Sequence, residues 1–342
     1  MKKMTCYHPL KAWPVGRTAS GKTDYLITSN KIGWIKYDYR YNRWNKGGEN
    51  PPNGAITDYI HIPCGHCVGC RLAYSRDWAN RCMLEAKYHK YNWFFTLTYR
   101  DQDLTQNSWF NSETGEAGYS YTLVPEDLTL FWKRLRKNTG QKVRYYACGE
   151  YGDRTARPHY HAIVFGLEID DLKLYKKTLQ GFNLYTSETI NNIWKHGYVI
   201  IANCTWETCA YTSRYVMKKR LGKTAAFYGQ YNMVPEFVRM SRRPGIAQQY
   251  YLDHAGEIYE TDQLIFSAQN GGKKSRPPHY FDRLFEQECP ELYAGVREKR
   301  VRLAELLQQV KARDSDLDYY SLLEREEQAK ENQIKSLKRI DF

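Results

Sequence analysis

The feature that most constrains this fold is a regular alternation of strand-like and helix-like segments between Trp93 and Cys204. Runs of β-branched and aromatic residues predict four strands, at Trp93–Tyr99, Val143–Tyr151, Pro158–Phe165 and Tyr198–Cys204. Helices are predicted from Pro125 to about Lys137 and over Ser187–His196, which Gly197 ends. The order strand, helix, strand, strand, helix, strand predicts an α+β fold with an antiparallel central sheet, a split βαβ core of the ferredoxin-like or RRM-like kind.

The segments on either side of this core predict additional elements. Arg71–Lys90 has the apolar spacing of a helix, and Thr205 can N-cap a further helix to about Arg220. The last segment is rich in Leu, Glu and Lys and predicts charged helices. We therefore expect four regions: an N-terminal region with a Cys knuckle and a helix at 1–90, the core at 91–222, a basic extension at 223–285 and a helical tail at 286–342.

An excess of positive charge fits a polyanionic partner. The formal net charge is +13, and Leu128–Arg144 contains Lys133, Arg134 and four further bases without an acid. Tyr211–Arg243 contains eight bases and one acid. Basic patches of this kind fit nucleic acid, although a basic surface that serves solubility would explain the charge equally well.

The hydropathy pattern argues against a membrane protein. The chain has no stretch of about 18 apolar residues, and Met1–Leu10 lacks the apolar segment of a secretory signal. We therefore expect an intracellular protein. The chain also lacks a Gly-x-x-x-x-Gly-Lys-Ser/Thr motif, so we expect neither a nucleotide cofactor nor a built-in helicase.

Two histidines on one predicted strand form a candidate metal site. Because side chains alternate along a strand, His159 and His161 lie on one face, about 7 Å apart at Cα, while Tyr160 lies on the other. Two imidazoles on a rigid strand make a two-ligand platform for a divalent cation. The alternative is a pair of partly buried histidines that only form hydrogen bonds within the fold.

Glu150 is the candidate third ligand. A symmetric hairpin between the two central strands places Glu150 opposite His159, and opposed residues of an antiparallel pair share a face. Cys148 falls opposite His161 and is an alternative ligand. A register shifted by one residue would remove Glu150 from that face. Two His and one carboxylate leave open positions for water and phosphate oxygens.

The helix predicted after Thr205 carries two tyrosines. Tyr211, Tyr215 and Lys218 are spaced i, i+4 and i+7 and therefore share one face. A phenol with a pKa of about 10 is a poor nucleophile at neutral pH, but a metal ion at the scissile phosphate and nearby cations can make it effective. The alternative is an amphipathic helix with packed tyrosines. The candidate contacts to a nucleic-acid backbone are Arg157, Arg214, Lys219 and Arg220, with Lys133 and Arg134.

A compact cysteine motif precedes the core. Cys64, Cys67 and Cys70 are separated by two residues each, and Cys6 is a candidate fourth thiol. Four thiolates suit a structural Zn²⁺, and His66 or His8 could replace one of them. An iron–sulfur cluster and three reduced thiols without a metal are the alternatives.

In combination, these motifs resemble those of the HUH endonucleases, in which two His flank a usually hydrophobic residue, here His159-Tyr160-His161. The wider pattern, ACGEYGDRTARPHYHAIVFG followed by CAYTSRYVMKK, is similar to the replication initiators of small single-stranded DNA phages of the Microviridae, of the gokushovirus type. The segments CYHPLKAW, PCGHCVGC, FFTLTYRD and MSRRPG also match. The resemblance covers most of residues 1–285 and implies that 91–222 is an HUH nuclease core.

The resemblance implies a rolling-circle mechanism without hydrolysis or ATP. One of the paired nucleophiles, Tyr211 and Tyr215, would cleave the origin strand, forming a 5′-phosphotyrosine link and a free 3′-OH. The other would allow the released strand to be joined into a circle. Lys218, or Arg214, would contact the phosphate. The implied metal is Mg²⁺ or Mn²⁺, and the ligands that match the family are His159, His161 and Glu150.

The resemblance also implies partners. These are single-stranded origin DNA, together with a host helicase and polymerase in the cytoplasm of a bacterial host. An HUH transposase or relaxase would share the chemistry, and a noncatalytic single-stranded nucleic-acid-binding module would share the sheet. Histidines on the central strand, in place of paired stacking aromatics, disfavour the noncatalytic module.

Overall fold

The computed structural model describes residues 6–153, 155–178, 181–214, 219, 222–268 and 271–336. These residues form two compact units. The first consists of the described residues of Met1–Ala73 and Arg300–Lys338, and the second of Tyr74–Lys299. Both units combine helices with antiparallel strands, as the α+β prediction requires.

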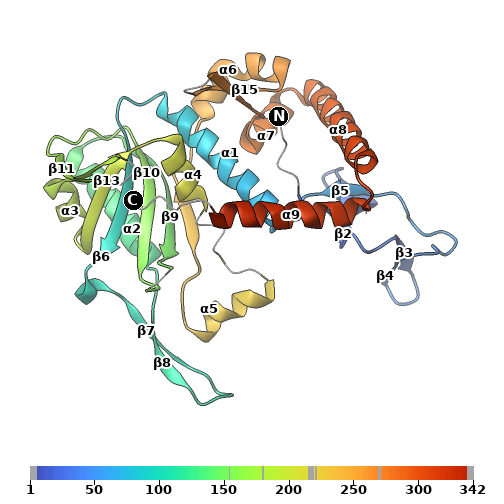
Figure 1. Cartoon of the computed structure of the whole chain (residues 1–342), viewed down its shortest axis with the longest axis horizontal. Helices are drawn as coiled ribbons and strands as arrows, with labels where there is room; N and C mark the ends of the chain where they lie inside the picture. Colours follow the sequence, from blue (N-terminus) through green and yellow to red (C-terminus); the bar gives the residue numbers. More distant parts are fainter. Residues whose placement is uncertain are drawn as a thin grey trace. The chain divides into compact units, whose positions relative to one another are not determined.

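The second unit is built on a seven-stranded antiparallel sheet (Figure 1). From edge to edge its strands are β11 (Lys173–Lys177), β12 (Asn183–Thr186), β13 (Gly197–Asn203), β6 (Asn92–Tyr99), β10 (Pro158–Phe165), β9 (Arg144–Tyr151) and β14 (Phe237–Met240). The four predicted strands are β6, β9, β10 and β13, each within one residue of its predicted ends. The helix α2 (Pro125–Thr139) follows β6, and α3 (Glu188–Trp194) precedes β13.

Helices cover both faces of this sheet (Figure 1). On one face, Tyr160 of β10 packs in a cluster with Phe131 of α2 and with residues of α3. On the other face, Ile163 of β10 packs in a cluster with Cys209 of α4 (Trp206–Arg214) and with residues of α1 (Val68–Ala86). The alternation of the strand therefore turns Tyr160 into one core and leaves the histidines on the side of α1 and α4, as predicted.

Local sequence explains several helix ends. Pro125 occupies the first turn of α2, where its missing N–H has no partner to lose. Gly140 follows the same helix in the left-handed conformation, with φ of 67°. Thr205 caps α4, because its hydroxyl accepts a hydrogen bond from the backbone N–H of Thr208 at 3.3 Å.

One predicted boundary is wrong. The sequence predicts that Gly197 ends the helix before it, but α3 ends at Trp194, where Lys195 adopts the left-handed cap conformation with φ of 72°. Gly197 instead begins β13. A Cβ at this position would lie 2.1 Å from the carbonyl oxygen of Thr98 on β6. The glycine is therefore required by close strand contact rather than by a helix end.

Further elements surround the sheet of the second unit. A 3-10 turn (Asp101–Asp103) and the hairpin of β7 (Gln106–Phe110) and β8 (Ala117–Tyr121) follow β6, and this hairpin projects beyond the sheet in Figure 1. After α4 come a 3-10 turn (Gly222–Ala225), α5 (Ala226–Gln230), α6 (Gln248–Thr261), β15 (Leu264–Ala268), β16 (Gly271–Ser275), α7 (His279–Glu288) and α8 (Pro290–Arg313). The helices α6 and α7 and the start of α8 share a separate apolar cluster that includes Tyr251, Phe281 and Tyr293.

The first unit contains two small antiparallel sheets and a C-terminal helix. One sheet has the order β2 (Thr23–Thr28), β1 (Leu10–Arg17), β5 (Ile60–Ile62), and the other pairs β3 (Trp34–Asp38) with β4 (Arg43–Gly47). Trp13 is fully buried, and its indole N–H donates to the hydroxyl of Thr28 at 2.8 Å. Leu323 of α9 (Tyr319–Ser336) is also fully buried, against Tyr7 and Cys67.

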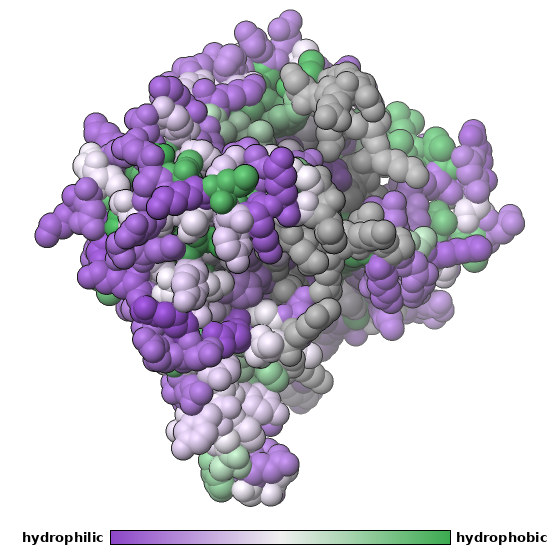
Figure 2. All heavy atoms as spheres, turned by 60° about the vertical axis from the view of Figure 1, so that its left-hand side comes forward, coloured by the Kyte–Doolittle hydropathy of each residue, from purple (hydrophilic) through white to green (hydrophobic). Residues whose placement is uncertain are grey.

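The surface matches the polar composition. Hydrophilic residues dominate the face shown in Figure 2, and hydrophobic residues form small separate patches on it. In the part of the chain that the structure describes, no helix is both long and apolar enough to cross a membrane. The large apolar side chains are instead gathered in the internal clusters.

We predict opposite effects for two glycine-to-alanine substitutions. Gly197→Ala should destabilise the second unit by about 1–3 kcal/mol or more, because the added methyl overlaps the backbone of β6. Gly256→Ala, inside α6 with open space around it, should stabilise by roughly 0.5–1 kcal/mol. Urea unfolding followed by circular dichroism measures both. Equal stability of the two variants would contradict this account of Gly197.

Candidate functional site

The pairing of β9 with β10 brings three ligand atoms together. The observed register places His159 opposite Glu150 and His161 opposite Cys148, as the sequence predicts. One carboxylate oxygen of Glu150, Oε1, lies 2.7 Å from His159 Nε2 and 3.1 Å from His161 Nε2. Glu150 and His161 are buried, and His159 is partly exposed. The hairpin therefore presents two imidazoles and one carboxylate on one face of the sheet.

The protonation pattern of this group fits a cation. His159 Nδ1 lies 3.1 Å from the backbone carbonyl oxygen of Arg157, so this nitrogen carries the proton of a neutral ring. Its Nε2 then has only a lone pair, which faces the carboxylate oxygen of Glu150. Two lone pairs repel at this distance, so the contact needs either a further proton or a cation shared between the atoms. The three ligand atoms lie within 4.8 Å of one another, which suits a divalent cation.

The charge state of Glu150 also suits a metal ligand. Burial acts to raise the pKa of Glu150, but its hydrogen bonds with His159 and His161 outweigh burial and lower the pKa to about 2. The carboxylate is therefore ionised at neutral pH, which is the form that binds a cation. Cys148, the alternative ligand, is fully buried and is not part of the converging group that the described residues form.

Two residues of β6 support His161, and the sequence analysis did not identify them. Thr96 is paired with His161 across the strands, and its hydroxyl oxygen lies 3.1 Å from His161 Nδ1. The ring of Phe94 is stacked on the imidazole, with centroids 5.4 Å apart. These contacts fix the orientation of the ring and leave Nε2 to face Glu150. The alternation of Trp93–Tyr99 places Phe94 and Thr96 on one face, but that pattern alone does not show which strand they meet.

The helix α4 brings Tyr211 to the same face of the sheet. Its ring centroid lies 5.2 Å from that of His161 and 6.0 Å from that of Phe94, with both pairs of rings nearly perpendicular. Tyr211 is only partly buried, whereas Cys209 and Thr212 of α4 are fully buried. The phenol of Tyr211 is therefore beside the Glu–His–His group and at the edge of the core.

The remaining candidates that follow Tyr211 are described only in part. Tyr215, Lys218 and Arg220 lie outside the described residues. Arg214 is exposed at the C-terminal end of α4, and Lys219 is partly buried. Of the bases in this segment, Arg214 is thus the one that the structure places at the end of the helix that carries Tyr211.

Three other basic candidates are not gathered at the histidines. Lys133 and Arg134 lie on α2, which covers the opposite face of the sheet. The guanidinium of Arg134 donates hydrogen bonds to the carbonyl oxygens of Ile193 and Trp194 at 2.9 and 3.1 Å, and so holds the end of α3. Arg157 donates to the carbonyl oxygen of Tyr99 at 3.0 Å and forms an ion pair with Asp101.

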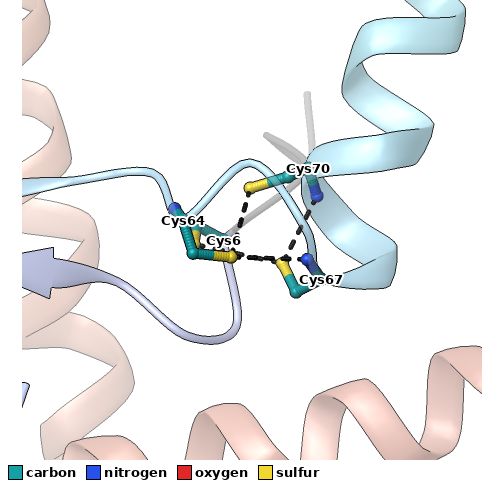
Figure 3. Close-up of side chains that lie close together, drawn as sticks. All are labelled: Cys6, Cys64, Cys67 and Cys70. Carbon is teal, nitrogen blue, oxygen red and sulfur yellow. Dashed lines mark hydrogen bonds between the residues drawn. The ribbon is translucent and has the colours of Figure 1, made fainter. Parts of the chain in front are cut away.

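A second group of metal-binding side chains lies in the first unit. The sulfur atoms of Cys6, Cys64, Cys67 and Cys70 lie within 4.8 Å of one another and point toward a common centre (Figure 3). Backbone N–H groups donate to three of them: to Cys6 from Cys64, to Cys64 from His66 and Cys67, and to Cys67 from Tyr7 and Cys70, at 3.2 to 3.4 Å. Such N–H···S bonds stabilise thiolates, the form in which cysteine binds metals.

The thiols of this group are coupled to one another. A hydrogen bond with Cys6 lowers the pKa of Cys67 to about 3, and the same bond raises the pKa of Cys6. Four thiols at this separation ionise together only when a cation offsets their mutual repulsion. His8 and His66 are not part of the converging group among the described residues, and His8 is paired with Glu327 of α9.

Comparison with known proteins points to one family. The family model of the replication-associated protein ORF2 matches residues 92–220, the segment that contains Glu150, both histidines and Tyr211. Replication-associated protein ORF2 of Spiroplasma virus 4 is 38% identical over 250 residues, which cover 71% of this chain and 74% of the relative. No solved structure matches the chain.

Two further relatives come from phages of other bacteria. Replication-associated protein VP4 of Bdellovibrio phage phiMH2K is 26% identical over 317 residues, 89% of this chain and 85% of the relative. Replication-associated protein ORF4 of Chlamydia phage 1 is 31% identical over 231 residues, 65% of this chain and 53% of the relative. The family predicted from the sequence motifs is therefore confirmed, and this chain belongs to the replication-associated proteins of phages.

Proposed function

We propose that this chain is a rolling-circle replication initiator that nicks and rejoins single-stranded origin DNA by metal-assisted tyrosine attack, the chemistry of the HUH endonucleases. The observation that carries the proposal is the convergence of Glu150, His159 and His161 beside the phenol of Tyr211. The strand order β13-β6-β10-β9, with α2 and α3 between strands, supports a ferredoxin-like split βαβ core.

The chemistry exchanges one phosphate ester for another. Glu150, His159 and His161 would hold Mg²⁺ or Mn²⁺, which when bound polarises the scissile phosphate. The phenolic oxygen of Tyr211 forms a bond to phosphorus and loses its proton, while the bond from phosphorus to the 3′-oxygen breaks. The 5′ side of the nick stays on the tyrosine, and a 3′-OH is released. Because the number of ester bonds is unchanged, a 3′-OH can reverse the step and rejoin DNA without ATP.

The residues after Tyr211 complete the proposal. Tyr215 is the second nucleophile, since it follows Tyr211 by one helical turn in the sequence. Lys218, or Arg214, contacts the phosphate. Two tyrosines allow one to retain the displaced strand while the other cleaves the regenerated origin, and joining of the two ends yields a circle. Strand separation and extension would come from a helicase and a polymerase of the host cell.

The first test is the covalent adduct. With a labelled single-stranded origin oligonucleotide and Mn²⁺, wild type should form a protein–DNA adduct that mass spectrometry maps to Tyr211 or Tyr215. Tyr211→Phe/Tyr215→Phe, His161→Ala and EDTA should each reduce the adduct at least about a hundredfold. Tyr198→Phe, an exposed tyrosine of β13, is the control and should be unaffected. An adduct that persists in the double variant would overturn the proposal.

The second test concerns the support of His161. Thr96→Val removes the hydroxyl that contacts His161 Nδ1 and should weaken Mn²⁺ binding by about 10- to 100-fold. Thr98→Val is a matched control, because the Thr98 hydroxyl donates to the carbonyl oxygen of Tyr198 rather than to a histidine. Isothermal titration with Mn²⁺ measures both affinities. Equal affinities for the two variants would show that Thr96 does not support the metal site.

We also propose that Cys6, Cys64, Cys67 and Cys70 bind one structural Zn²⁺. The four converging sulfur atoms and their N–H···S bonds support this, because tetrahedral thiolate sites are typical of zinc. The site is in the first unit, and Val68 at the start of α1 is capped by Glu327 of α9, with the N–H and carboxylate oxygen 3.2 Å apart. Zinc would thus link the N-terminal segment to the start of α1 and to the helix α9 packed there.

The zinc proposal predicts a selective cysteine effect. Purified protein should contain about one zinc per chain, and Cys67→Ser should lose it and lower the melting temperature. Cys289→Ser changes a cysteine that is also partly buried but outside the group, and it should keep the zinc. Elemental analysis by plasma mass spectrometry measures the content. Iron with acid-labile sulfide in place of zinc would contradict the proposal.

A further inference from the structure

We propose that the β3–β4 hairpin of the first unit is an additional binding site for single-stranded DNA, in which exposed tyrosines stack on bases and arginines contact phosphates. The inference rests on the proposed function, because single-stranded DNA is the substrate of that function. It adds a site formed by residues 34–47, none of which belongs to the Glu–His–His group, the tyrosine helix or the cysteine group.

The base of the hairpin is anchored. Trp34–Asp38 pairs with Arg43–Gly47 over five residue pairs. Ile35 is fully buried and exchanges two backbone hydrogen bonds with Ile56, at 3.1 and 2.8 Å. The side chain of Lys36 donates to the carbonyl oxygen of Asn53 at 2.7 Å. These contacts tie the two strands to the rest of the first unit, so the hairpin can present its tip as a preformed surface.

The tip carries aromatic rings that the fold does not bury. Tyr39 and Tyr41 expose 89% and 59% of their surface. The ring of Tyr39 lies edge-on to Tyr37, with centroids 5.0 Å apart, and Tyr37 in turn contacts Trp44 at 5.1 Å. The buried side of this cluster supports the rings, while the tyrosines at the tip remain open to a ligand. Exposed rings of this kind are the platforms on which unpaired bases stack.

Positive charge surrounds the same rings. The guanidinium carbons of Arg40 and Arg43 lie 5.5 and 5.3 Å from the ring centroid of Tyr41. The one acid in the sequence of the hairpin is Asp38, and its carboxylate accepts hydrogen bonds from the N–H groups of Arg40 and Tyr41 and from the side chain of Asn45. The acid therefore fixes the turn, and the charge that the tip presents outward is positive.

This combination favours single-stranded DNA over other partners. Double-stranded DNA offers phosphates to the arginines, but its bases are stacked on one another and not available to Tyr39 and Tyr41. An acidic protein could satisfy the arginines without needing open ring faces. A single strand supplies both a charged backbone and free base faces, which is the pairing of chemistry that this tip displays.

A second hairpin provides a matched comparison. The β7–β8 hairpin exposes Phe110 and Tyr119, by 67% and 76%. Its sequence has no Lys or Arg between Gln106 and Tyr121, and it includes Glu113 and Glu116. It therefore has exposed rings without the positive charge, and we do not expect it to hold a DNA backbone.

Binding of a fluorescein-labelled dT30 oligonucleotide to the full chain tests the proposal. Fluorescence anisotropy is measured in EDTA, so that cleavage does not occur. Tyr39→Ala/Tyr41→Ala should weaken binding by about tenfold or more, and Tyr39→Trp/Tyr41→Trp should restore it, because stacking needs a ring at these positions. Phe110→Ala/Tyr119→Ala should stay within about twofold of wild type. Arg40→Gln/Arg43→Gln should lower the slope of log K against log salt by about 1.4, or roughly 0.7 for each phosphate contact.

Several results would overturn the proposal. Wild-type affinity for dT30 in the Tyr39→Ala/Tyr41→Ala variant would do so, and this is the result that an acidic protein partner predicts. An equal loss of affinity for a 30-base-pair duplex would show that base stacking is not involved. Failure of the tryptophan variant to restore binding would show that the alanine variant acts through the fold of the hairpin.

The outcome is independent of the nicking chemistry. The oligonucleotide contains no origin sequence, and the measurement needs no metal. Hairpin-dependent dT30 binding without any covalent adduct would overturn the proposed function and leave a DNA-binding hairpin. Adduct formation with hairpin-independent binding would overturn this inference alone.

Discussion

The antiparallel pairing of β9 with β10 is the constraint on which the rest of the site depends. Side chains alternate along both strands, so a single register decides whether Glu150 faces the histidines or the opposite core. The same register turns Tyr160 and Ala162 into the core under α2 and α3. Slippage by one residue would bury the imidazoles in that core and remove the carboxylate from them. The stability of the core and the geometry of the site are therefore specified by one interaction.

The sheet also determines what can reach the histidines. The strand β6 pairs with β10 on the side away from β9, and it supplies Thr96 and Phe94 to His161. The helix α4 packs over the same face and supplies Tyr211. Rigid elements thus position both the ligands and the candidate nucleophile, which is what a reaction that depends on alignment requires. The exposed Arg214 lies at the end of that helix, where positive charge can meet an incoming backbone.

The core was predictable from the sequence because its signals are local. Strand alternation, Pro125 at a helix start and Gly140 at a helix end each depend on a few neighbouring residues, and the Glu150–His159 pairing spans a short turn. Thr96 was not predictable, because its contact with His161 joins residues 65 positions apart and depends on which strands are neighbours. Gly197 was misinterpreted for the same reason: its constraint is the carbonyl oxygen of Thr98, on another strand.

Charge was the least reliable of the local signals. Lys133 and Arg134 belong to a basic run, yet α2 places them on the face opposite the histidines, and Arg134 binds the carbonyl groups that end α3. Conversely, the burial of Leu323 and the capping of Val68 by Glu327 occur in a tail whose composition predicts only charged helices. In each case the side chain's partner, rather than its charge, determines its role.

The central claim is that Glu150, His159 and His161 bind a divalent cation beside Tyr211. The most direct measurement is anomalous X-ray diffraction from crystals of the full chain soaked in Mn²⁺. We expect one anomalous peak at bonding distance from Glu150 Oε1 and both Nε2 atoms, with the ring of Tyr211 still against His161. A peak elsewhere, or no peak at these ligands at saturating Mn²⁺ and neutral pH, would contradict the account.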